Sequence, residues 1–315
     1  MVRIGIDAMG GDFAPKNIVL GAIQAYTRIQ PQTRLILFGD RSRIEVECTE
    51  AGFDAAKFEI VHTSQIIGMG DHPAKAFQQK PDSSISVGFH ALAKCRIDGF
   101  ASAGNTGAML AGVIYTVKAI PGIIRPAISS VYPLVNGKTA LLLDVGLNVD
   151  CKPDVLYQYG LLGSIYAKHM MGLDNPRVAL LNIGEEEEKG NLLTREVFKI
   201  MQDTPDFNFV GNIEANHIFS GEIADVVVTD GFVGNVVLKQ AEAMYVLTKK
   251  QGIDNEYFNR FNYELHGGTP VLGVNAPVII GHGISSPKAV ENMILQTEYA
   301  VKIRLVDKIA EALDK

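Results

Sequence analysis

Residues 225–249 read DVVVTDGFVGNVVLKQAEAMYVLTK, and this stretch contains the unit from which the fold is predicted. The run Asp225–Thr229 has the length and the branched residues of a buried strand. A short glycine loop follows it, and Gly234–Lys249 then shows the apolar spacing of a helix. A strand that leads through a tight loop into a helix is the repeating unit of α/β proteins with a mainly parallel sheet.

The same alternation of strand and helix runs along almost the whole chain. Several apolar runs lack polar alternation, as expected for strands covered by helices on both faces. The predicted strands are 2–7, 34–38, 58–62, 99–103, 127–132, 139–144, 178–182, 208–211, 225–229 and 278–280. The predicted helices are 16–29, 83–93, 106–117, 154–171, 192–201, 234–249 and 287–313. We therefore expect a doubly wound α/β/α sandwich, with residues 1–315 in a single domain of two lobes.

The composition excludes several classes of protein. Of 315 residues, 47% are hydrophobic and 20% charged, which allows a large core and excludes intrinsic disorder. The net charge of −6 disfavours nucleic-acid binding, which needs a basic face. The start of the chain is typical of a strand rather than of a secretory signal, and the most apolar stretch, 107–124, is interrupted by Lys118 and Pro121. We therefore expect a cytoplasmic protein.

Polar residues gather where the predicted strands end, which is where a doubly wound sheet binds its ligands. Five strands end in small glycine loops that contain Asp, Asn, Ser or Thr: 7–12, 102–107, 144–150, 182–185 and 229–235. Two of these loops, 104–107 and 231–235, place backbone N–H groups at a helix N-terminus, where an anion is favoured. The alternative for either loop alone is that its glycines only permit the turn.

Other catalytic motifs are missing from the sequence. Neither GxGxxG after the first strand, nor GxxxxGK[ST], nor GxSxG is present, which disfavours a standard dinucleotide site, a P-loop and a hydrolase elbow. Cys151 beside Lys152 has two interpretations, an activated thiolate or a small buried thiol, and the second is the commoner.

The titratable candidates are of two kinds. Three histidines lie in loops with glycine or proline: His72, His266 and His282. Each is either an acid–base group or an ordinary surface histidine. Asp7, Asp144 and Asp230 end predicted strands, where an aspartate either holds Mg²⁺ or, more commonly, caps the following turn.

Six motifs occur in a fixed order along the chain: 6–12 (IDAMGGD), 102–107 (SAGNTG), 143–153 (LDVGLNVDCKP), 182–187 (NIGEEE), 228–235 (VTDGFVGN) and 267–273 (GGTPVLG). Together they resemble the motifs of the PlsX family, the bacterial acyl-ACP:phosphate acyltransferases. The resemblance extends from residue 2 to about residue 300, and six ordered motifs are far more specific than one glycine loop.

The resemblance implies reversible transfer of a fatty acyl group from acyl carrier protein to inorganic phosphate, giving acyl phosphate for phospholipid synthesis. It also implies a homodimer without a bound redox cofactor, whose product passes to a membrane glycerol-3-phosphate acyltransferase. No metal ligands are assigned, and the sequence leaves open both a metal requirement and a peripheral position of this cytoplasmic protein at the inner membrane face. The implied fold is that of phosphotransacetylase and the isocitrate and isopropylmalate dehydrogenases. The alternatives are a non-catalytic scaffold for carrier protein or membrane enzymes, and an NAD(P)-dependent dehydrogenase, whose metal aspartates and arginine cluster are missing here.

One segment departs from the family pattern. Family members contain a longer basic and apolar helical segment, associated with membrane contact, before the GGTP loop. Here it shrinks to residues 249–263, which keep aromatic and some basic residues but are too short for a strong amphipathic anchor. The sequence leaves open whether this segment still binds a membrane.

An enzyme of this kind must hold a small dianion against a thioester carbonyl and stabilise the oxyanion that forms. The candidate catalytic residues are Asn105, Asn148, Lys152, Asn182 and His72. The candidate phosphate- and substrate-binding residues are Asp7, Gly10, Gly11, Ser102, Gly104, Thr106, Gly107, Asp144, Glu185, Lys189, Asp230, Gly234 and Asn235. We expect backbone N–H groups at 105–107 and 234–235 to bind phosphate and oxyanion, and His72 or Lys189 to assist the leaving thiolate.

Two surfaces are predicted for partners. A basic rim for the acidic carrier protein is expected from Lys75, Lys80, Lys94, Arg96, Lys249 and Lys250, with ordinary surface lysines as the alternative. The last predicted helix, 287–313, has an apolar side that either forms part of a dimer face or caps the sheet.

Overall fold

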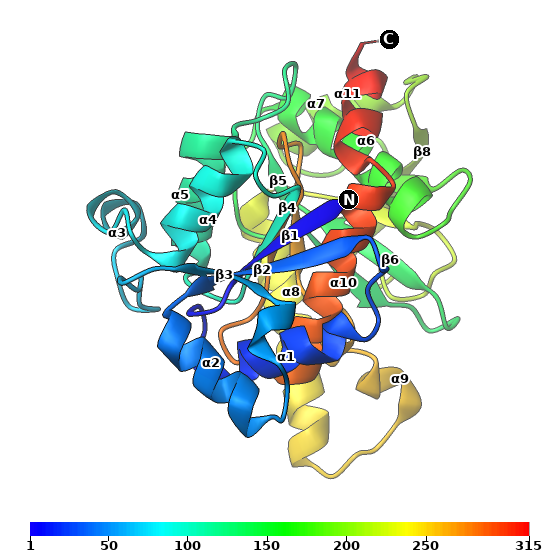
Figure 1. Ribbon diagram of the computed structural model, residues 1–315. Coiled ribbons are helices and arrows are strands. Elements are labelled where there is room, and N and C mark those ends of the chain that lie inside the picture. The colour runs from blue at the N-terminus through cyan, green and yellow to red at the C-terminus, as the bar shows by residue number, and fades with distance from the viewer. Residues whose placement is uncertain (315) are drawn as a thin grey trace. The chain divides into compact units, whose positions relative to one another are not determined.

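The computed structural model describes residues 1–314, in which the chain forms two compact units. The first unit comprises Met1–Ile120 and Tyr263–Val306, and the second comprises Pro121–Asn262 with the segment from Asp307 onward. Each unit contains a sheet with helices packed on it, so the α/β class expected from the sequence is confirmed (Figure 1). That the two units act as one domain stays a prediction.

The sheet of the first unit has the strand order β3-β2-β1-β4-β11-β10. Its strands are β1 (Val2–Asp7), β2 (Thr33–Gly39), β3 (Glu59–His62), β4 (Gly99–Ser102), β10 (Thr269–Leu272) and β11 (Val278–Ile280). All neighbours pair in parallel except β10 and β11, which pair antiparallel. The carboxyl ends of β1, β4 and β11 therefore lie at the same edge, and the loops that follow them are neighbours.

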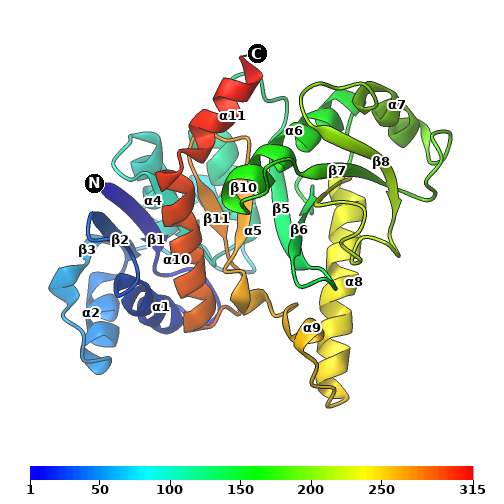
Figure 2. The ribbon, with the colours of Figure 1, turned by 90° about the vertical axis from the view of Figure 1, so that its right-hand side faces the viewer.

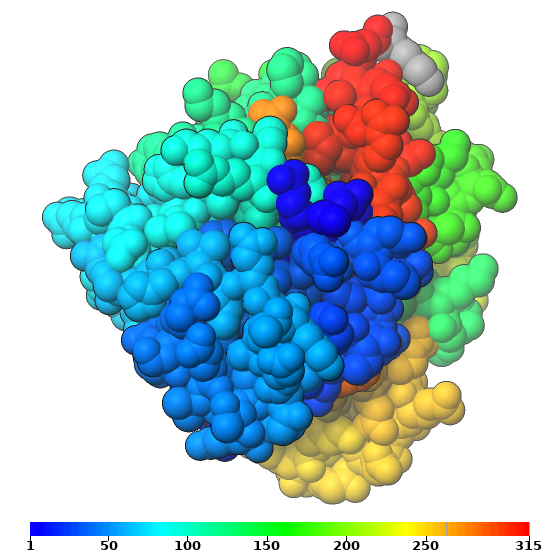
Figure 3. Space-filling view, in the orientation of Figure 1, coloured from blue at the N-terminus to red at the C-terminus, as the bar shows by residue number. Residues whose placement is uncertain are grey.

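Alternate residues of each strand in the first unit face opposite helical layers. Ile4 and Leu37 pack against α1 (Lys16–Tyr26), α2 (Arg41–Glu50) and α10 (Pro287–Lys302), whereas Phe38 and Phe100 face the other layer. That layer consists of α3 (Pro73–Gln79), α4 (Ser84–Ala93) and α5 (Thr106–Gly112). Figures 1 and 2 show α1 beside α10, and Figure 3 shows the surface of this unit, with α1 and α2 in blue and α4 and α5 in cyan.

The sheet of the second unit has the order β5-β6-β9-β7-β8. Its strands are β5 (Ala127–Pro133), β6 (Thr139–Leu143), β7 (Arg177–Asn182), β8 (Asn208–Glu214) and β9 (Val226–Val228). Only β5 runs antiparallel to its neighbour. The carboxyl ends of β6, β9, β7 and β8 therefore share one edge.

Four helices lie wholly in the second unit, and three short helical turns occur in the described part of the chain. The second unit contains α6 (Pro153–Met170), α7 (Leu192–Met201), α8 (Gly231–Lys250) and α9 (Glu256–Asn259). The short elements are 3-10 turns at Ala55–Lys57 and Tyr263–Leu265 and a π-helical turn at Val113–Val117. Helix α6 packs over β6, β7 and β9, and α7 packs beside it. Figure 2 shows α8 as a long helix with α9 near its C-terminal end.

The predicted strands are all present, 2–7 and 278–280 with the predicted ends and the others with shifted ends, and the main errors concern helices. The predicted helix 287–313 is two helices, α10 and α11 (Leu305–Leu313), because Arg304 adopts a left-handed φ of 57° that interrupts the helix. Residues 106–117 form α5 followed by the π turn. Helices α2, α3 and α9 and strand β10 were missed. The buried side of α10 packs on α1 and β1, which favours its interpretation as a cap on the sheet.

Candidate functional site

Asp7 anchors the loops that follow β1 and β4 in the first unit. Its fully buried carboxylate accepts hydrogen bonds from the Met9 N–H (3.1 Å) and from the Ser102 hydroxyl (2.6 Å). Ser102 Oγ accepts the N–H of Gly104 at 2.9 Å. Burial raises the pKa of Asp7, and its hydrogen bonds oppose this rise. Asp7 and Ser102, which the sequence placed among substrate-binding residues, thus direct their side chains into the protein and hold the two loops together.

Gly10 lies where these two loops touch. A Cβ atom at Gly10 would be 2.1 Å from Asp7 Oδ2 and 2.7 Å from the backbone nitrogen of Gly104, so no other residue fits without displacing the backbone. Gly11 has a φ of 111°, a conformation that glycine adopts at little cost. The glycines of the first motif are therefore required by close packing and by backbone conformation.

Asn105 joins the start of α5 to the loop 68–71. Its Oδ1 accepts the N–H of Ala108 at 3.0 Å and so caps the helix. Its Nδ2 donates to the carbonyl oxygens of Gly68, Met69 and Asp71 at 3.1 to 3.2 Å. The side chain is buried, with 5% exposed, and its polar atoms are bonded within the protein. The geometry therefore gives Asn105 a positioning role rather than the direct catalytic contact expected from the sequence.

The first turn of α5 presents two adjacent backbone donors. Intrahelical bonding leaves the N–H groups of Thr106 and Gly107 without a helical acceptor, and no other acceptor contacts them within residues 1–314. Thr106 is exposed and Gly107 half-buried. A Cβ at Gly107 would lie 2.4 Å from Pro73 Cγ, so the start of α3 packs directly on this turn. Exposed His72, the residue before Pro73, is thereby brought beside the predicted anion loop.

Asp144 has the corresponding position at the end of β6 in the second unit. Its buried carboxylate accepts three backbone N–H groups, from Ile128 (2.9 Å), Leu147 (3.1 Å) and Asn148 (2.6 Å). Burial raises the pKa of Asp144 against the effect of these bonds. Of the two interpretations open from the sequence, the turn cap therefore fits the structure better than a magnesium ligand.

Asn148 is also bonded mainly within the protein. Its Nδ2 donates to the Pro126 carbonyl and to the Tyr159 hydroxyl, both at 2.7 Å. The neighbouring Cys151 thiol donates to the Asn148 carbonyl at 3.4 Å, and burial raises the pKa of this thiol to about 11. Cys151 is therefore a thiol near neutral pH, which disfavours the nucleophile interpretation. Lys152, at the start of α6, is exposed.

The first turn of α8 uses most of its backbone donors internally. Asp230 caps the helix by accepting the Val233 N–H at 2.8 Å, as the capping interpretation of this residue expected. The N–H of Gly231 donates to the Asn148 carbonyl at 2.7 Å, and that of Gly234 donates to the Asp230 carbonyl at 3.0 Å. The expectation that Gly234 offers a free N–H to an anion is therefore wrong for this conformation.

Close packing explains the glycine at position 234. A Cβ there would be 1.9 Å from the Asp144 carbonyl oxygen. Asn235 lies one residue further, within α8, and its Nδ2 donates to the Val145 carbonyl at 3.1 Å. In the first turn of α8, Phe232 has the one N–H for which residues 1–314 provide no acceptor.

Asn182, at the end of β7, organises the loop that contains Glu185 and Lys189. Its Nδ2 donates to the Lys189 carbonyl (3.2 Å) and to Asn212 Oδ1 (3.1 Å), and its Oδ1 accepts the Ile183 N–H at 2.9 Å. Lys189 Nζ is 4.0 Å from a Glu186 carboxylate oxygen. Asn182 thus positions this loop, and Lys189 is exposed beyond it.

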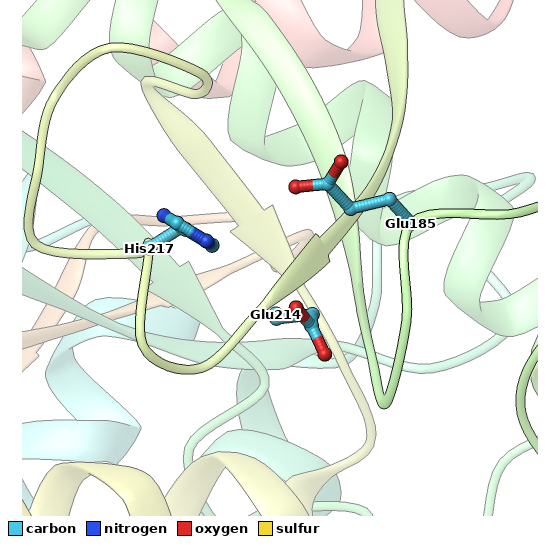
Figure 4. A group of neighbouring side chains, drawn as sticks. All are labelled: Glu185, Glu214 and His217. Carbon is cyan, nitrogen blue, oxygen red and sulfur yellow. The ribbon is translucent and has the colours of Figure 1, made fainter.

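Glu185 belongs to a group that the sequence did not indicate. Ligand atoms of Glu185, Glu214 and His217 all lie within 4.8 Å of one another, and Figure 4 shows Glu185 and His217 directed toward each other. Such donors are typical of divalent cation sites, although exposed acidic groups often converge without an ion. The sequence places the end of this strand at residue 211, whereas β8 continues to Glu214. Glu214 was therefore not recognised as a residue at a strand end.

The predicted basic rim is divided. Lys94 and Arg96 line one pocket of about 460 Å³ in the first unit, together with His90. Lys80 instead forms an ion pair with Asp71 at 2.6 Å. In the second unit, Lys249 Nζ is 3.5 Å from Asp254. Two of the six rim residues thus face a common surface hollow.

Two further observations concern the predicted sites. His266 precedes β10 and His282 follows β11. The residues on either side of His282 contact the loops after β4 and β1, since the Gly281 N–H donates to the Ser102 carbonyl and the Gly283 carbonyl accepts the Asp12 N–H, both at 2.8 Å. Within residues 1–314, no helix combines the length and the apolar composition that crossing a membrane requires.

Solved structures with the same fold define the class of protein to which this chain belongs. A phosphotransacetylase from Streptococcus pyogenes has the same fold with a TM-score of 0.70, 16% identity, and coverage of 96% of this chain and 94% of that one. A branched-chain phosphotransacylase from Enterococcus faecalis gives a TM-score of 0.63 at 18% identity, covering 96% and 99%. The chain is thus an α/β protein of the phosphotransacetylase fold.

The sequence comparisons then identify the family. The family model described as fatty acid synthesis protein matches residues 2–308. A phosphate acyltransferase of Halothermothrix orenii is 42% identical, over 100% of this chain and 99% of the relative. The phosphate acyltransferase of Oceanobacillus iheyensis is 40% identical, over 99% and 98%. The chain belongs to the fatty acid synthesis protein family, the PlsX family, which confirms the resemblance found in its motifs.

Proposed function

We propose that this protein transfers a fatty acyl group from acyl-acyl carrier protein to inorganic phosphate, giving acyl phosphate for phospholipid synthesis. The relatives named phosphate acyltransferase support phosphate as the acceptor. The family description, fatty acid synthesis protein, supports a fatty acyl donor. Acyl carrier protein is our choice of donor because the motifs resemble those of enzymes that use it.

The single observation that supports the phosphate site is the first turn of α5. The N–H groups of Thr106 and Gly107 lie next to each other without an acceptor within residues 1–314, at the positive end of the helix. Two aligned N–H donors and the Thr106 hydroxyl suit the oxygens of a phosphate dianion. Asn105 holds this turn against the loop that leads to His72.

The reaction follows from the chemistry of the two substrates. A phosphate oxygen attacks the thioester carbonyl carbon and forms a tetrahedral oxyanion. The carbon–sulfur bond then breaks, and the thiolate of the carrier leaves and takes up a proton. Because phosphate is itself the nucleophile, no covalent enzyme intermediate is needed, which agrees with the raised pKa of Cys151. We propose His72, which precedes the proline that packs on the α5 turn, as the source of that proton. Lys152 stays a candidate catalytic charge.

A proline substitution tests the phosphate site directly. Thr106→Pro removes one N–H at the first helical position, where proline is tolerated. Asn105, with φ −56° and ψ 109°, already has the extended ψ that precedes a proline. We expect the KM for phosphate to rise roughly tenfold to a hundredfold, as for a lost hydrogen bond to a charged group. Thr106→Ala, which keeps the N–H, is the matched control; equal KM values for the proline variant and the wild type would remove this turn from the site.

One assay separates the proposed activity from the alternatives. Acyl-acyl carrier protein is incubated with labelled phosphate, and acyl phosphate is detected by its reaction with hydroxylamine. A non-catalytic scaffold would bind the carrier protein without forming this product. A dehydrogenase would instead change the absorbance of a nicotinamide cofactor. Formation of labelled product by the wild type, and its loss on heating the enzyme, supports the acyltransferase.

We further propose partners for the reaction. Lys94 and Arg96, which line one pocket with His90, are suited to an acidic carrier protein. The exposed apolar residues of α8, among them Val236 and Leu247, are suited to a homodimer. The product is passed to a membrane glycerol-3-phosphate acyltransferase. Charge reversal at Lys94 and Arg96 is expected to raise the KM for the carrier substrate without changing that for phosphate.

We place the protein in the cytoplasm, at most peripheral to the inner membrane. The aromatic residues of the short segment 249–263 support this proposal, since Tyr257, Phe258 and Phe261 are half-buried. The alignments with the two relatives run over 334 and 332 positions, more than the 315 residues of this chain, so the relatives contain additional residues. We expect this protein to bind vesicles more weakly than one of these longer relatives does. A vesicle flotation assay of the two proteins side by side measures this, and equal flotation would contradict the expectation.

A further inference from the structure

The second unit contains an apolar pocket of about 320 Å³ between α8 and the segment that contains α9. One wall is formed by α8, through residues that include Val237, Ala241 and Met244. Another wall is aromatic and includes Phe219, Phe258 and Phe261. Among the described lining residues, Gln240 contributes the one amide and two tyrosines contribute hydroxyls, and the other side chains are apolar. Such a lining suits a hydrocarbon ligand and disfavours a sugar, nucleotide or phosphate, whose polar groups would lose hydrogen bonds there.

The aromatic wall is held in place by its own contacts. The ring of Phe261 meets those of Phe219 and Tyr257 edge-on, with centroids 5.6 and 5.4 Å apart. Arg260 lies between Tyr257 and Phe261 in sequence. It donates to the Leu134 carbonyl at 3.0 Å and so attaches this segment to the β5–β6 hairpin. The pocket is therefore formed by the fold before any ligand arrives.

The helical wall connects the pocket to the start of α8. Val237, Ala241 and Met244 follow one another at helical spacing on one side of the helix. Val237 is two residues beyond Asn235, and Met244 lies about 13 Å along the axis from Asn235 at the rise of an α-helix. The side of α8 that lines the pocket thus extends from near the glycine loop 229–235 toward the C-terminal end of the helix.

We propose that this pocket binds the hydrocarbon tail of the fatty acyl group. The proposal rests on the proposed function, because it assigns the acyl chain of that donor to a place in the fold. It also gives the shortened segment 249–263 a purpose: its aromatic side chains cover substrate hydrocarbon. Affinity is then expected to rise with each methylene that the pocket removes from water.

Ala241 is the residue at which this proposal is tested. Its small side chain lines the pocket, so Ala241→Phe fills the space that the tail would occupy. Ala243, two residues away on the same helix, is exposed and does not line the pocket. Ala243→Phe is therefore a matched control for helix propensity and added bulk.

The first measurement is kcat/KM with carrier protein bearing eight-carbon or sixteen-carbon acyl chains. We expect Ala241→Phe to lower the sixteen-carbon to eight-carbon ratio about tenfold or more, because the longer tail loses buried methylenes. Ala243→Phe is expected to keep the wild-type ratio. Met244→Ala, which enlarges the pocket, is expected to raise the ratio and shows that the effect does not come from damaged folding.

The second measurement needs no catalysis. A fluorescent polyene fatty acid is titrated into the wild type and both variants, and binding is expected for the wild type and Ala243→Phe but not for Ala241→Phe. If the wild type binds the probe yet forms no acyl phosphate, the proposed activity fails and the pocket assignment stands. If the wild type forms acyl phosphate while Ala241→Phe changes neither ratio nor probe binding, the pocket assignment is overturned. The assignment would also be overturned if Ala241→Phe changed the sedimentation coefficient of the protein but left the sixteen-carbon to eight-carbon ratio unchanged. The pocket would then be a contact between copies of the chain.

Discussion

The loops that start α5 and α8 are alike in sequence and different in use. Each follows a buried strand, contains two glycines and begins a helix with a polar cap. In the α5 loop, Thr106 and Gly107 keep two N–H groups without acceptors in the described part of the chain. In the α8 loop, Gly231 and Gly234 use theirs within the protein. A glycine at a helix start therefore indicates either an anion site or a close contact, and the acceptors around it decide which.

The largest expected effect tests the close contact in the α8 loop. Gly234→Ala places a Cβ 1.9 Å from the Asp144 carbonyl oxygen, which is backbone and cannot turn aside. We expect a loss of more than about 4 kcal/mol in the free energy of unfolding, or failure to fold. Gly52→Ala is the control, because Gly52 has a φ of 66° and open space around it; it is expected to cost about 1 kcal/mol. Urea unfolding measures both, and a Gly234→Ala variant as stable as the control would refute the contact.

A smaller effect distinguishes the two helix caps. Asn105→Ala removes a cap and also leaves three carbonyl groups of loop 68–71 without their donor. Asp230→Ala removes a cap alone. We expect losses of about 2 to 3 kcal/mol for the first and about 1 kcal/mol for the second, by thermal unfolding. We also expect Asn105→Ala, by loosening the α5 turn, to raise the KM for phosphate several-fold. Equal losses for the two variants would mean that the 68–71 contacts contribute nothing.

The smallest effect concerns the thiol beside the α8 loop. Because burial raises the pKa of Cys151 to about 11, its thiolate fraction at pH 8 is small and grows as the pH rises toward that value. We expect Cys95, which is exposed, to be alkylated first at pH 8, with activity retained. Mass spectrometry after timed reaction with iodoacetamide measures both sites. Faster modification of Cys151, with loss of turnover, would restore it as a candidate nucleophile.

The sequence predicts the strands well and the polar helices poorly. Strands such as β1 and β7 are buried on both faces, so their apolar runs are visible without knowledge of partners. Helix α2 buries only Ile44 and Cys48 in ten residues and therefore lacks a clear apolar stripe. Strand β10 contains Pro270 within a glycine-rich motif that is typical of a turn.

For the site, the sequence predicts the loops but not how their side chains are used. The motifs identify Asn105 and Asp144 as residues at strand ends. Their hydrogen-bond partners, however, include loop 68–71 for Asn105 and Ile128 for Asp144, which lie far away in sequence. The group Glu185, Glu214 and His217 is likewise assembled from two strand ends. No local pattern encodes such long-range partners, so whether a polar side chain faces substrate or scaffold becomes visible only in the fold.

The contact at Gly234 has a consequence for recognition. Because the start of α8 rests directly on the carbonyl of Asp144, the loops after β6 and β9 cannot shift independently. A ligand that meets them encounters a surface whose shape is set in advance, and binding then loses little conformational entropy. Selectivity at these loops would arise from rejection of molecules that do not fit, not from adaptation to those that do.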